Sequence, residues 1–291
     1  MEALRRGTAS ANGLDFALLE TGPADGPLAL CLHGFPDTAH TWRHLLPALA
    51  DAGYRAVAPF QRGYAPTSVP ADGAYQTAAL ATDAVALHDA LGGGPDAVLI
   101  GHDWGAAAAY GAAALAPDRF RRAVALALPP VGALLTGFLR YEQLKRSFYV
   151  FLFQTPLAEA VLVPEFIAAL WRDWSPGHDG AADAARAAEA LAAPANAAAA
   201  LGYYRAMLDP ARHVDRYKAA QETVERPGTR PVLYLHGADD GCLGAETAEP
   251  AAVLPHLPPG SRAEIVADAG HFLHLERPDE IRARVLDWLA S

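Results

Sequence analysis

An aspartate, Asp103, stands at the centre of the pentapeptide GHDWG (residues 101–105), which directly follows the apolar run Ala97–Ile100. The pattern Gly-x-nucleophile-x-Gly is typical of a sharp strand-to-helix turn that lifts one side chain above a sheet. Small residues flank such a turn because its backbone is strained and the helix lies close to the strand. A carboxylate in this place can attack an sp3 carbon and form an ester with the protein. We therefore predict that Asp103 is a nucleophile, ionised at neutral pH; the alternative is an ordinary helix cap.

A second motif, HGFP at residues 33–36, directly follows the apolar run Leu28–Leu32. A loop in this place can supply one backbone N–H to a developing oxyanion, and the residue after the nucleophile supplies another. Trp104 is the residue after the nucleophile, and Phe35 is the expected first donor because the proline that follows it has no N–H. We predict an oxyanion hole formed by Phe35 and Trp104; the alternative is an incidental Gly-Pro turn.

Two later turns carry an acid and a histidine. The apolar run Val232–Leu235 ends in HGADDG, which places Asp240 where the partner of a catalytic histidine is expected, with Asp239 as an alternative. His271 follows the last short strand in a Gly-His-Phe turn and is the best candidate for the general base, although most of the eleven histidines must be structural or exposed. His274 is expected to pack or to cap a helix.

Short apolar runs alternate with segments of helical length through most of the chain. Runs of this kind are typical of strands buried on both faces, and the alternation predicts an α/β fold with a mostly parallel sheet flanked by helices. An Asn-Gly pair at residues 12–13 predicts a tight hairpin turn. The expected strands are Leu14–Leu19, Leu28–Leu32, Arg55–Ala58, Ala97–Ile100, Ala123–Leu128, Val232–Leu235 and Glu264–Val266, and the expected helices are Thr41–Ala52, Gln76–Leu91, Gly105–Leu115 and Pro278–Leu289.

The alternation stops between residues 129 and 226, where no strand-like run occurs. Prolines and glycines near both ends indicate boundaries, and the segment has helical patterns at Phe148–Phe153 and Glu165–Trp174 and an alanine-rich stretch at Ala181–Leu201. We therefore expect a helical cap (lid) at residues 129–226, inserted after a sheet strand, and a core formed by residues 1–128 and 227–291.

Composition narrows the class of protein. The chain has 291 residues with a formal net charge of −10 and no basic run, so a nucleic-acid partner is not expected. No stretch has the ~20 apolar residues that span a membrane, and the first residues lack the apolar region of a secretory signal. With only two cysteines, Cys31 and Cys242, we expect no disulfide framework and a cytoplasmic location. We also expect no cofactor and no metal, because the histidines form no convincing ligand set.

These segments together resemble the epoxide hydrolases of the α/β-hydrolase fold. The order of nucleophile, acid and histidine is the order of that fold, and the resemblance covers nearly the whole chain. The similar segments are HGFPDTAHTWR, PFQRGYAPTS, GHDWG, HGADDG and GHFLHLERP. One loop departs from the general pattern of the fold, because the usual D-x-R-G-x-G-x-S reads FQRGYAPT at residues 60–67. That loop is mainly structural, so the departure does not weaken the resemblance.

The resemblance also implies two cap tyrosines whose hydroxyls hold the epoxide oxygen. They correspond to Tyr149 in SFYVFLFQTP and Tyr204 in LGYYRAM, with Tyr203 and Tyr141 as alternatives. The implied reaction opens an epoxide to form an ester on Asp103. Water activated by the predicted histidine–acid pair then hydrolyses this ester to give a vicinal diol.

The substrate is expected to be a small apolar epoxide, which reacts with water. An apolar pocket suits it, and the candidate wall residues are Phe35, Trp104, Phe153 and Phe272. An apolar cap surface could also pair two chains in a homodimer.

Two other functions stay open. A haloalkane dehalogenase uses the same aspartate ester, and the indole of Trp104 would suit a halide, but Phe35 stands where those enzymes usually have a second halide donor. A non-catalytic ligand-binding relative of the fold predicts loss of the nucleophile, acid or base, and this chain has all three.

Overall fold

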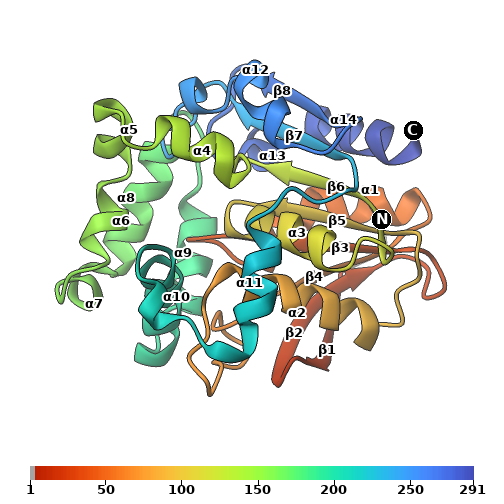
Figure 1. Cartoon of the computed structure of the whole chain (residues 1–291), viewed down its shortest axis with the longest axis horizontal. Coiled ribbons are helices and arrows are strands. Elements are labelled where there is room, and N and C mark those ends of the chain that lie inside the picture. Colours follow the sequence, from red (N-terminus) through yellow and green to blue (C-terminus); the bar gives the residue numbers. More distant parts are fainter. Residues whose placement is uncertain (1–3) are drawn as a thin grey trace.

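The computed structural model describes residues 4–291 and has an eight-stranded sheet at its centre (Figure 1). The strand order is β1-β2-β4-β3-β5-β6-β7-β8, with β1 and β2 antiparallel to their neighbours and the pairs from β4 to β8 parallel. The strands are β1 (Arg5–Ala11), β2 (Leu14–Thr21), β3 (Leu28–Leu32), β4 (Arg55–Pro59), β5 (Ala97–His102), β6 (Phe120–Leu126), β7 (Val232–Gly237) and β8 (Arg262–Val266). The mostly parallel sheet of the predicted fold is confirmed.

The seven expected strands are present, and β1 is an eighth that the hydrophobic pattern did not mark. Most residues of β1 are exposed or half-buried because it is the edge strand, so its sequence RRGTASA lacks an apolar run. The turn between β1 and β2 has Asn12 and Gly13 at positive φ (47° and 77°), as the predicted tight hairpin requires.

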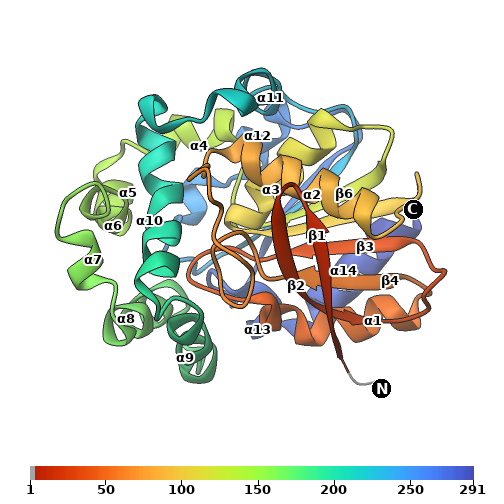
Figure 2. The ribbon, with the colours of Figure 1, turned by 90° about the horizontal axis from the view of Figure 1, so that it is seen from below.

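Helices cover both faces of the sheet (Figure 2). Alternate residues of β3 belong to different apolar clusters: Leu30 packs with α2 and α3, whereas Cys31 packs with α1 and α14. A strand buried on both faces needs apolar residues throughout, which explains its sequence LALCL. The core helices are α1 (Leu45–Asp51), α2 (Thr77–Ala90), α3 (Trp104–Leu115), α12 (Pro250–Val253), α13 (Leu273–Glu276) and α14 (Pro278–Ala290).

A helical insertion separates β6 from β7 and lies beyond the carboxyl ends of the parallel strands (Figure 1). Its last helix, α11, packs against α2 and α3 of the core. The insertion helices are α4 (Val131–Gly137), α5 (Tyr141–Arg146), α6 (Phe148–Leu152), α7 (Ala158–Val161), α8 (Pro164–Trp174), α9 (Ala181–Ala190), α10 (Pro194–Leu208) and α11 (Lys218–Val224). Within the described residues, no helix is both long and apolar enough to cross a bilayer.

The alanine-rich stretch forms two helices rather than one. Helix α9 ends at Ala190, and α10 begins with Pro194 in its first turn. Proline suits the first turn of a helix but cannot continue one from the preceding residues, so it divides the stretch. Because α10 starts anew at Pro194, its direction differs from that of α9, and Tyr204 on α10 lies over the carboxyl ends of the strands.

Candidate active site

The predicted strand-to-helix turn connects β5 to α3, with Asp103 between them at a φ of 51°. Positive φ is costly for a residue with a side chain, so the surrounding structure must hold it. A Cβ on Gly105 would collide with the carbonyl oxygen of Leu32, and a Cβ on Gly34 would collide with the Asp103 carboxylate. Gly105 therefore lets α3 approach the end of β3 closely, and Gly34 lets the loop after β3 approach Asp103.

The two carboxylate oxygens of Asp103 have different surroundings. Oδ1 accepts a hydrogen bond from the backbone N–H of Phe35 at 2.8 Å, and the N–H of Trp104 also binds the carboxylate. Oδ2 lies 3.9 Å from Nε2 of His271. The N–H of Phe35 thus holds one oxygen, while the other lies on the side of the histidine.

His271 and Asp240 are in direct contact. Nδ1 of His271 lies 2.9 Å from Oδ2 of Asp240, while Oδ1 of Asp240 accepts the backbone N–H groups of Cys242 (2.7 Å) and Leu243 (2.9 Å). Both members of the pair are buried, whereas Asp239 is exposed. The carboxylate is therefore fixed and orients the imidazole, leaving Nε2 without a hydrogen-bond partner among the described residues.

The environment shifts the pKa values of both reactive groups. Burial raises the pKa of Asp103 above its usual value, and the imidazole of His271 and the N–H groups of Phe35 and Trp104 oppose this shift. Burial lowers the pKa of His271, but the Asp240 carboxylate outweighs it, so this pKa lies above 6.5. Burial thus acts against the predicted ionised form of Asp103, and these partners act in its favour.

Tyr149 and Tyr204 come together above Asp103. Their rings pack edge to face with centroids 5.6 Å apart, and Tyr204 also packs against Phe35 (5.2 Å) and Trp104 (5.3 Å). Burial raises the pKa of each hydroxyl well above 10, and the Asp103 carboxylate adds to the shift. Both phenols therefore keep their protons and can act as donors.

The hydroxyls of the two alternative tyrosines lie elsewhere, although Tyr203 packs on Trp104 with ring centroids 5.5 Å apart and lines the same cavity as Asp103. The hydroxyl of Tyr203 is buried and donates to the carbonyl oxygen of Arg62 at 2.9 Å, so it joins α10 to the loop after β4. Tyr141 lies on α5 and is 72% exposed. Neither hydroxyl is aimed at the Asp103 carboxylate.

A largely apolar cavity of about 450 Å³ extends from Asp103 between the sheet layer and the insertion. Asp103, Trp104, Tyr149 and Tyr204 are among the residues that line it, together with Tyr75, Tyr110, Leu128, Val131, Leu134, Phe138, Val150 and Met207. Phe35, Phe153 and Phe272 are not among its lining residues. Phe35 and Phe153 pack behind Tyr204, and Phe272 stacks on Trp171 with ring centroids 3.5 Å apart.

The end of helix α8 contacts both loops of the histidine–acid pair, which was not predicted from the sequence. The carbonyl oxygen of Trp174 accepts the N–H groups of His271 (3.0 Å) and Gly241 (3.1 Å). Ser175 Oγ accepts the N–H of Phe272 at 3.0 Å and donates to Glu276 at 2.7 Å. A helix end in an insertion carries no motif that would reveal these contacts, since two of them use the backbone.

Cys242 is a second residue that the motifs did not reveal. Its Sγ lies 3.3 Å from the hydroxyl of Tyr149, which joins this tyrosine to the loop of Asp240. Two side-chain groups have metal-ligand geometry among the described residues, Asp240–Cys242–His271 and Asp37–His102–His274. In the first group, the direct bond between Asp240 and His271 already uses the ligand atoms.

Comparison with known proteins agrees with this geometry. The chain matches the α/β hydrolase fold family over residues 27–278. It is 33% identical to epoxide hydrolase A of Mycobacterium tuberculosis over 96% of this chain and 95% of the relative. It also resembles the crystal structure of epoxide hydrolase A from Mycobacterium thermoresistibile, with a TM-score of 0.80 and 28% identity over 99% of both chains. A second similar crystal structure is that of a putative epoxide hydrolase from Klebsiella pneumoniae, with a TM-score of 0.85 and 28% identity over 99% of this chain and 98% of the other.

The strand order and the turn after β5 define the class of protein: the chain belongs to the α/β-hydrolase family. Within that family it groups with the epoxide hydrolases.

Proposed function

We propose that this protein hydrolyses epoxides to vicinal diols through a covalent ester on Asp103. The observation that carries the proposal is the arrangement of three groups on one cavity. The carboxylate of Asp103 lies at its sheet side, and the phenols of Tyr149 and Tyr204 face it from the insertion. An epoxide between them has a nucleophile on one side and proton donors on the other.

In the first step, Oδ2 of Asp103 attacks an epoxide carbon. Oδ1 is held by the Phe35 N–H, so Oδ2 is the oxygen free to react. The C–O bond of the ring breaks as the ester forms, and the departing oxygen takes a proton from Tyr149 or Tyr204. A donor is needed there because an alkoxide is a poor leaving group and a phenol is a stronger acid than the alcohol that forms.

In the second step, Nε2 of His271 removes a proton from water, and the resulting hydroxide attacks the ester carbonyl carbon of Asp103. The oxyanion then forms at Oδ1, which the N–H of Phe35 already binds; the N–H of Trp104, which interacts with the same carboxylate, is the second donor. Asp240 stabilises the imidazolium. The ester bond to the former Oδ2 then breaks, and this oxygen takes the proton of the His271 imidazolium to complete the diol. The oxygen of water stays in the carboxyl group of Asp103, and the proton that came with it passes back to the phenolate.

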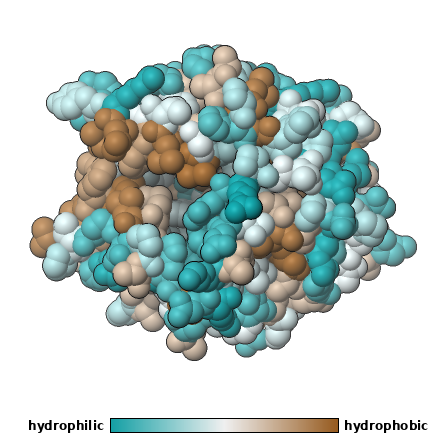
Figure 3. Space-filling view, viewed as in Figure 1, coloured by the Kyte–Doolittle hydropathy of each residue, from teal (hydrophilic) through white to brown (hydrophobic). Residues whose placement is uncertain are grey.

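The helices from α4 to α10 form the proposed cap that carries both tyrosines. Because α11 packs on the core, we place the second boundary of the cap before α11 rather than at residue 226. The exposed large apolar side chains gather on this insertion (Figure 3), where they include Val131, Leu135, Leu139, Phe148, Phe151, Leu157 and Val163. The homodimer and the cytoplasmic location stay predictions.

The experiment is a comparison of two substrate panels. Purified protein is incubated with terminal and internal apolar epoxides and, separately, with chloro- and bromoalkanes, and diol and halide are measured. We expect diol formation, its loss in Asp103→Asn, and no halide release. Halide release without diol formation would favour the dehalogenase, which Trp104 on the cavity wall also suits. Tight binding of apolar ligands without turnover of either panel would favour the non-catalytic relative.

A further inference from the structure

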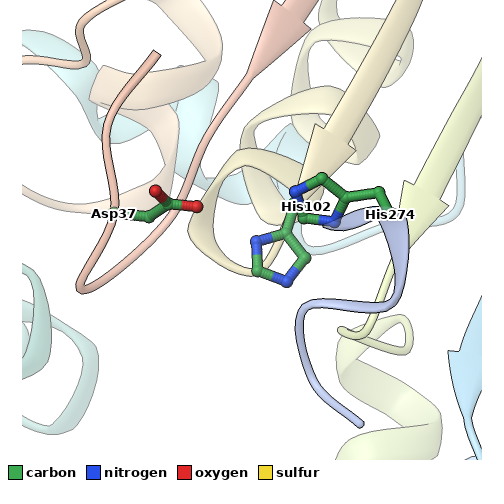
Figure 4. A group of neighbouring side chains, drawn as sticks. All are labelled: Asp37, His102 and His274. Atoms are coloured by element: carbon green, nitrogen blue, oxygen red, sulfur yellow. The ribbon is translucent and has the colours of Figure 1, made fainter. Parts of the chain in front are cut away.

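Three buried side chains meet behind the candidate active site: Asp37 from the loop after β3, His102 at the end of β5 and His274 on α13 (Figure 4). They are 1%, 0% and 3% exposed. One ligand atom from each lies within 4.8 Å of the other two. The Oδ2 of Asp37 and the Nδ1 atoms of both histidines have no hydrogen-bond partner among the described residues.

The second nitrogen of each imidazole has a hydrogen-bond partner. Nε2 of His102 lies 2.9 Å from the carbonyl oxygen of His271, which can only accept, so this nitrogen carries the proton. Nε2 of His274 lies 2.5 Å from the hydroxyl of Thr41, which is able to accept a proton from it. In that tautomer both Nδ1 atoms have a free lone pair and can serve as metal ligands.

The carboxylate completes the set of acceptors. Oδ1 of Asp37 accepts the backbone N–H of Thr38 at 2.7 Å, while Oδ2 has no hydrogen-bond partner among the described residues. In the tautomer that suits metal binding, three buried acceptors would have no donor, an arrangement that is costly unless something binds them. A single proton satisfies one pair and leaves one lone pair over. A water molecule has two protons for three acceptors. A divalent cation satisfies all three.

We propose that Asp37, His102 and His274 form a structural binding site for a divalent transition-metal ion of the zinc type. Two neutral imidazoles and a carboxylate are ligands that zinc takes, whereas magnesium and calcium prefer oxygen alone. Each histidine donates its other N–H to an oxygen, as metal-bound histidines generally do. Ligand atoms around tetrahedral zinc lie about 3.4 Å apart at bond lengths near 2.0 Å, so ligand atoms that lie within 4.8 Å of one another would move closer together on binding.

The site would join three segments that carry the candidate catalytic groups. His102 precedes Asp103, the Asp37 loop contains Phe35, and His274 follows His271 by one helical turn. A bound ion would therefore stabilise the folded arrangement without contacting the substrate, because no member of the set is among the residues that line the cavity.

The test uses untagged protein from cells grown with added zinc, together with protein refolded from denaturant with zinc or cobalt(II). Metal content is measured by mass spectrometry after gel filtration, and cobalt(II) is followed by its visible absorption. The variants Asp37→Asn and His274→Gln each remove one ligand. The matched control, His44→Gln, removes an exposed histidine on a neighbouring segment.

We expect about one equivalent of metal per chain in the wild type and in His44→Gln, with a rise in Tm on metal binding. We expect its loss in Asp37→Asn and His274→Gln. The proposal is overturned if the wild type binds no metal after both treatments, or if His274→Gln binds as much as the wild type. The wild-type measurement decides the matter even if a variant fails to fold.

Discussion

The candidate chemistry depends on how the two oxygens of one carboxylate are distinguished. Oδ1 of Asp103 is held by the N–H of Phe35 at 2.8 Å, and Oδ2 lies 3.9 Å from Nε2 of His271. Glycine at position 34 leaves the space that the carboxylate occupies, because a Cβ there would collide with Oδ1. The same N–H groups can then serve the resting carboxylate and the later oxyanion.

The tyrosine hydroxyls are predicted to act on ring opening and not on ester hydrolysis. Tyr149→Phe and Tyr204→Phe should each lower the rate of alkylation by roughly 100-fold, the lower part of the range for general acid catalysis, and the double variant should lose activity. Stopped-flow measurement of Trp fluorescence follows alkylation directly. The matched control is Tyr203→Phe, whose hydroxyl binds the backbone of Arg62, and it should lose stability and leave the alkylation rate unchanged. Equal rates in all three single variants would contradict the assignment.

The activity should rise with pH as His271 loses its proton. Its pKa lies above 6.5 because the Asp240 carboxylate outweighs the effect of burial, so the midpoint of kcat should lie above 6.5 where ester hydrolysis limits turnover. In Asp240→Asn the residual activity should have a lower midpoint. A raised pKa in the folded protein also means that this group stabilises the fold below pH 6.5, and that the contribution is lost as pH rises through the folded pKa. An unchanged midpoint in Asp240→Asn would show that another group titrates.

At the scale of elements, the turn between β5 and α3 requires close packing of backbone on backbone. Gly105→Ala should destabilise the protein by about 3 kcal/mol or more, since its Cβ would overlap the Leu32 carbonyl in β3, and overpacked sites rarely relax. Urea denaturation measures the change. Gly94→Ala is the control, because nothing lies within 4 Å of the Cβ that it would add. If both variants have equal stability, the packing argument for the turn is wrong.

The sequence predicted the elements well where one physical requirement dominates. Strands buried on both faces need apolar runs, and the runs of this kind became β3 to β7. The hydrophobic pattern did not mark β1, which is an exposed edge strand, or the division of the alanine-rich stretch by Pro194 into α9 and α10. Helix propensity cannot find such a break, because alanine favours a helix on both sides of it.

The sequence also predicted which candidate catalytic side chains lie together, since parallel strands end at one edge of the sheet. It could not predict packing that depends on the direction of the insertion helices. Phe272 was expected on the pocket wall, but Trp171 of α8 covers it. Cys242 was considered only in the expectation that there is no disulfide framework. Its contact with Tyr149 could not be predicted without knowing where α6 lies.

At the scale of the whole molecule, the insertion and the sheet layer are joined at the histidine–acid pair. Ser175→Ala leaves the N–H of Phe272 without its acceptor, which should cost about 1–3 kcal/mol of stability. Because Phe272 follows His271, kcat should also fall more than KM changes. Ser261→Ala is the matched control: its hydroxyl makes a similar pair of bonds, to the N–H of Val232 and the carbonyl of Pro258, away from the insertion. We expect it to lose stability and to keep its kcat, and equal kcat values for the two variants would argue against the coupling.

The covalent ester on Asp103 is the central claim, and a single turnover in 18O-labelled water tests it most directly. Enzyme in excess over an epoxide is allowed to react once, and peptides and diol are analysed by mass spectrometry. We predict that the label enters the carboxylate of Asp103 and is absent from the first diol, because water attacks the ester carbonyl and not the epoxide. Label in the first diol with none in Asp103 would contradict the account.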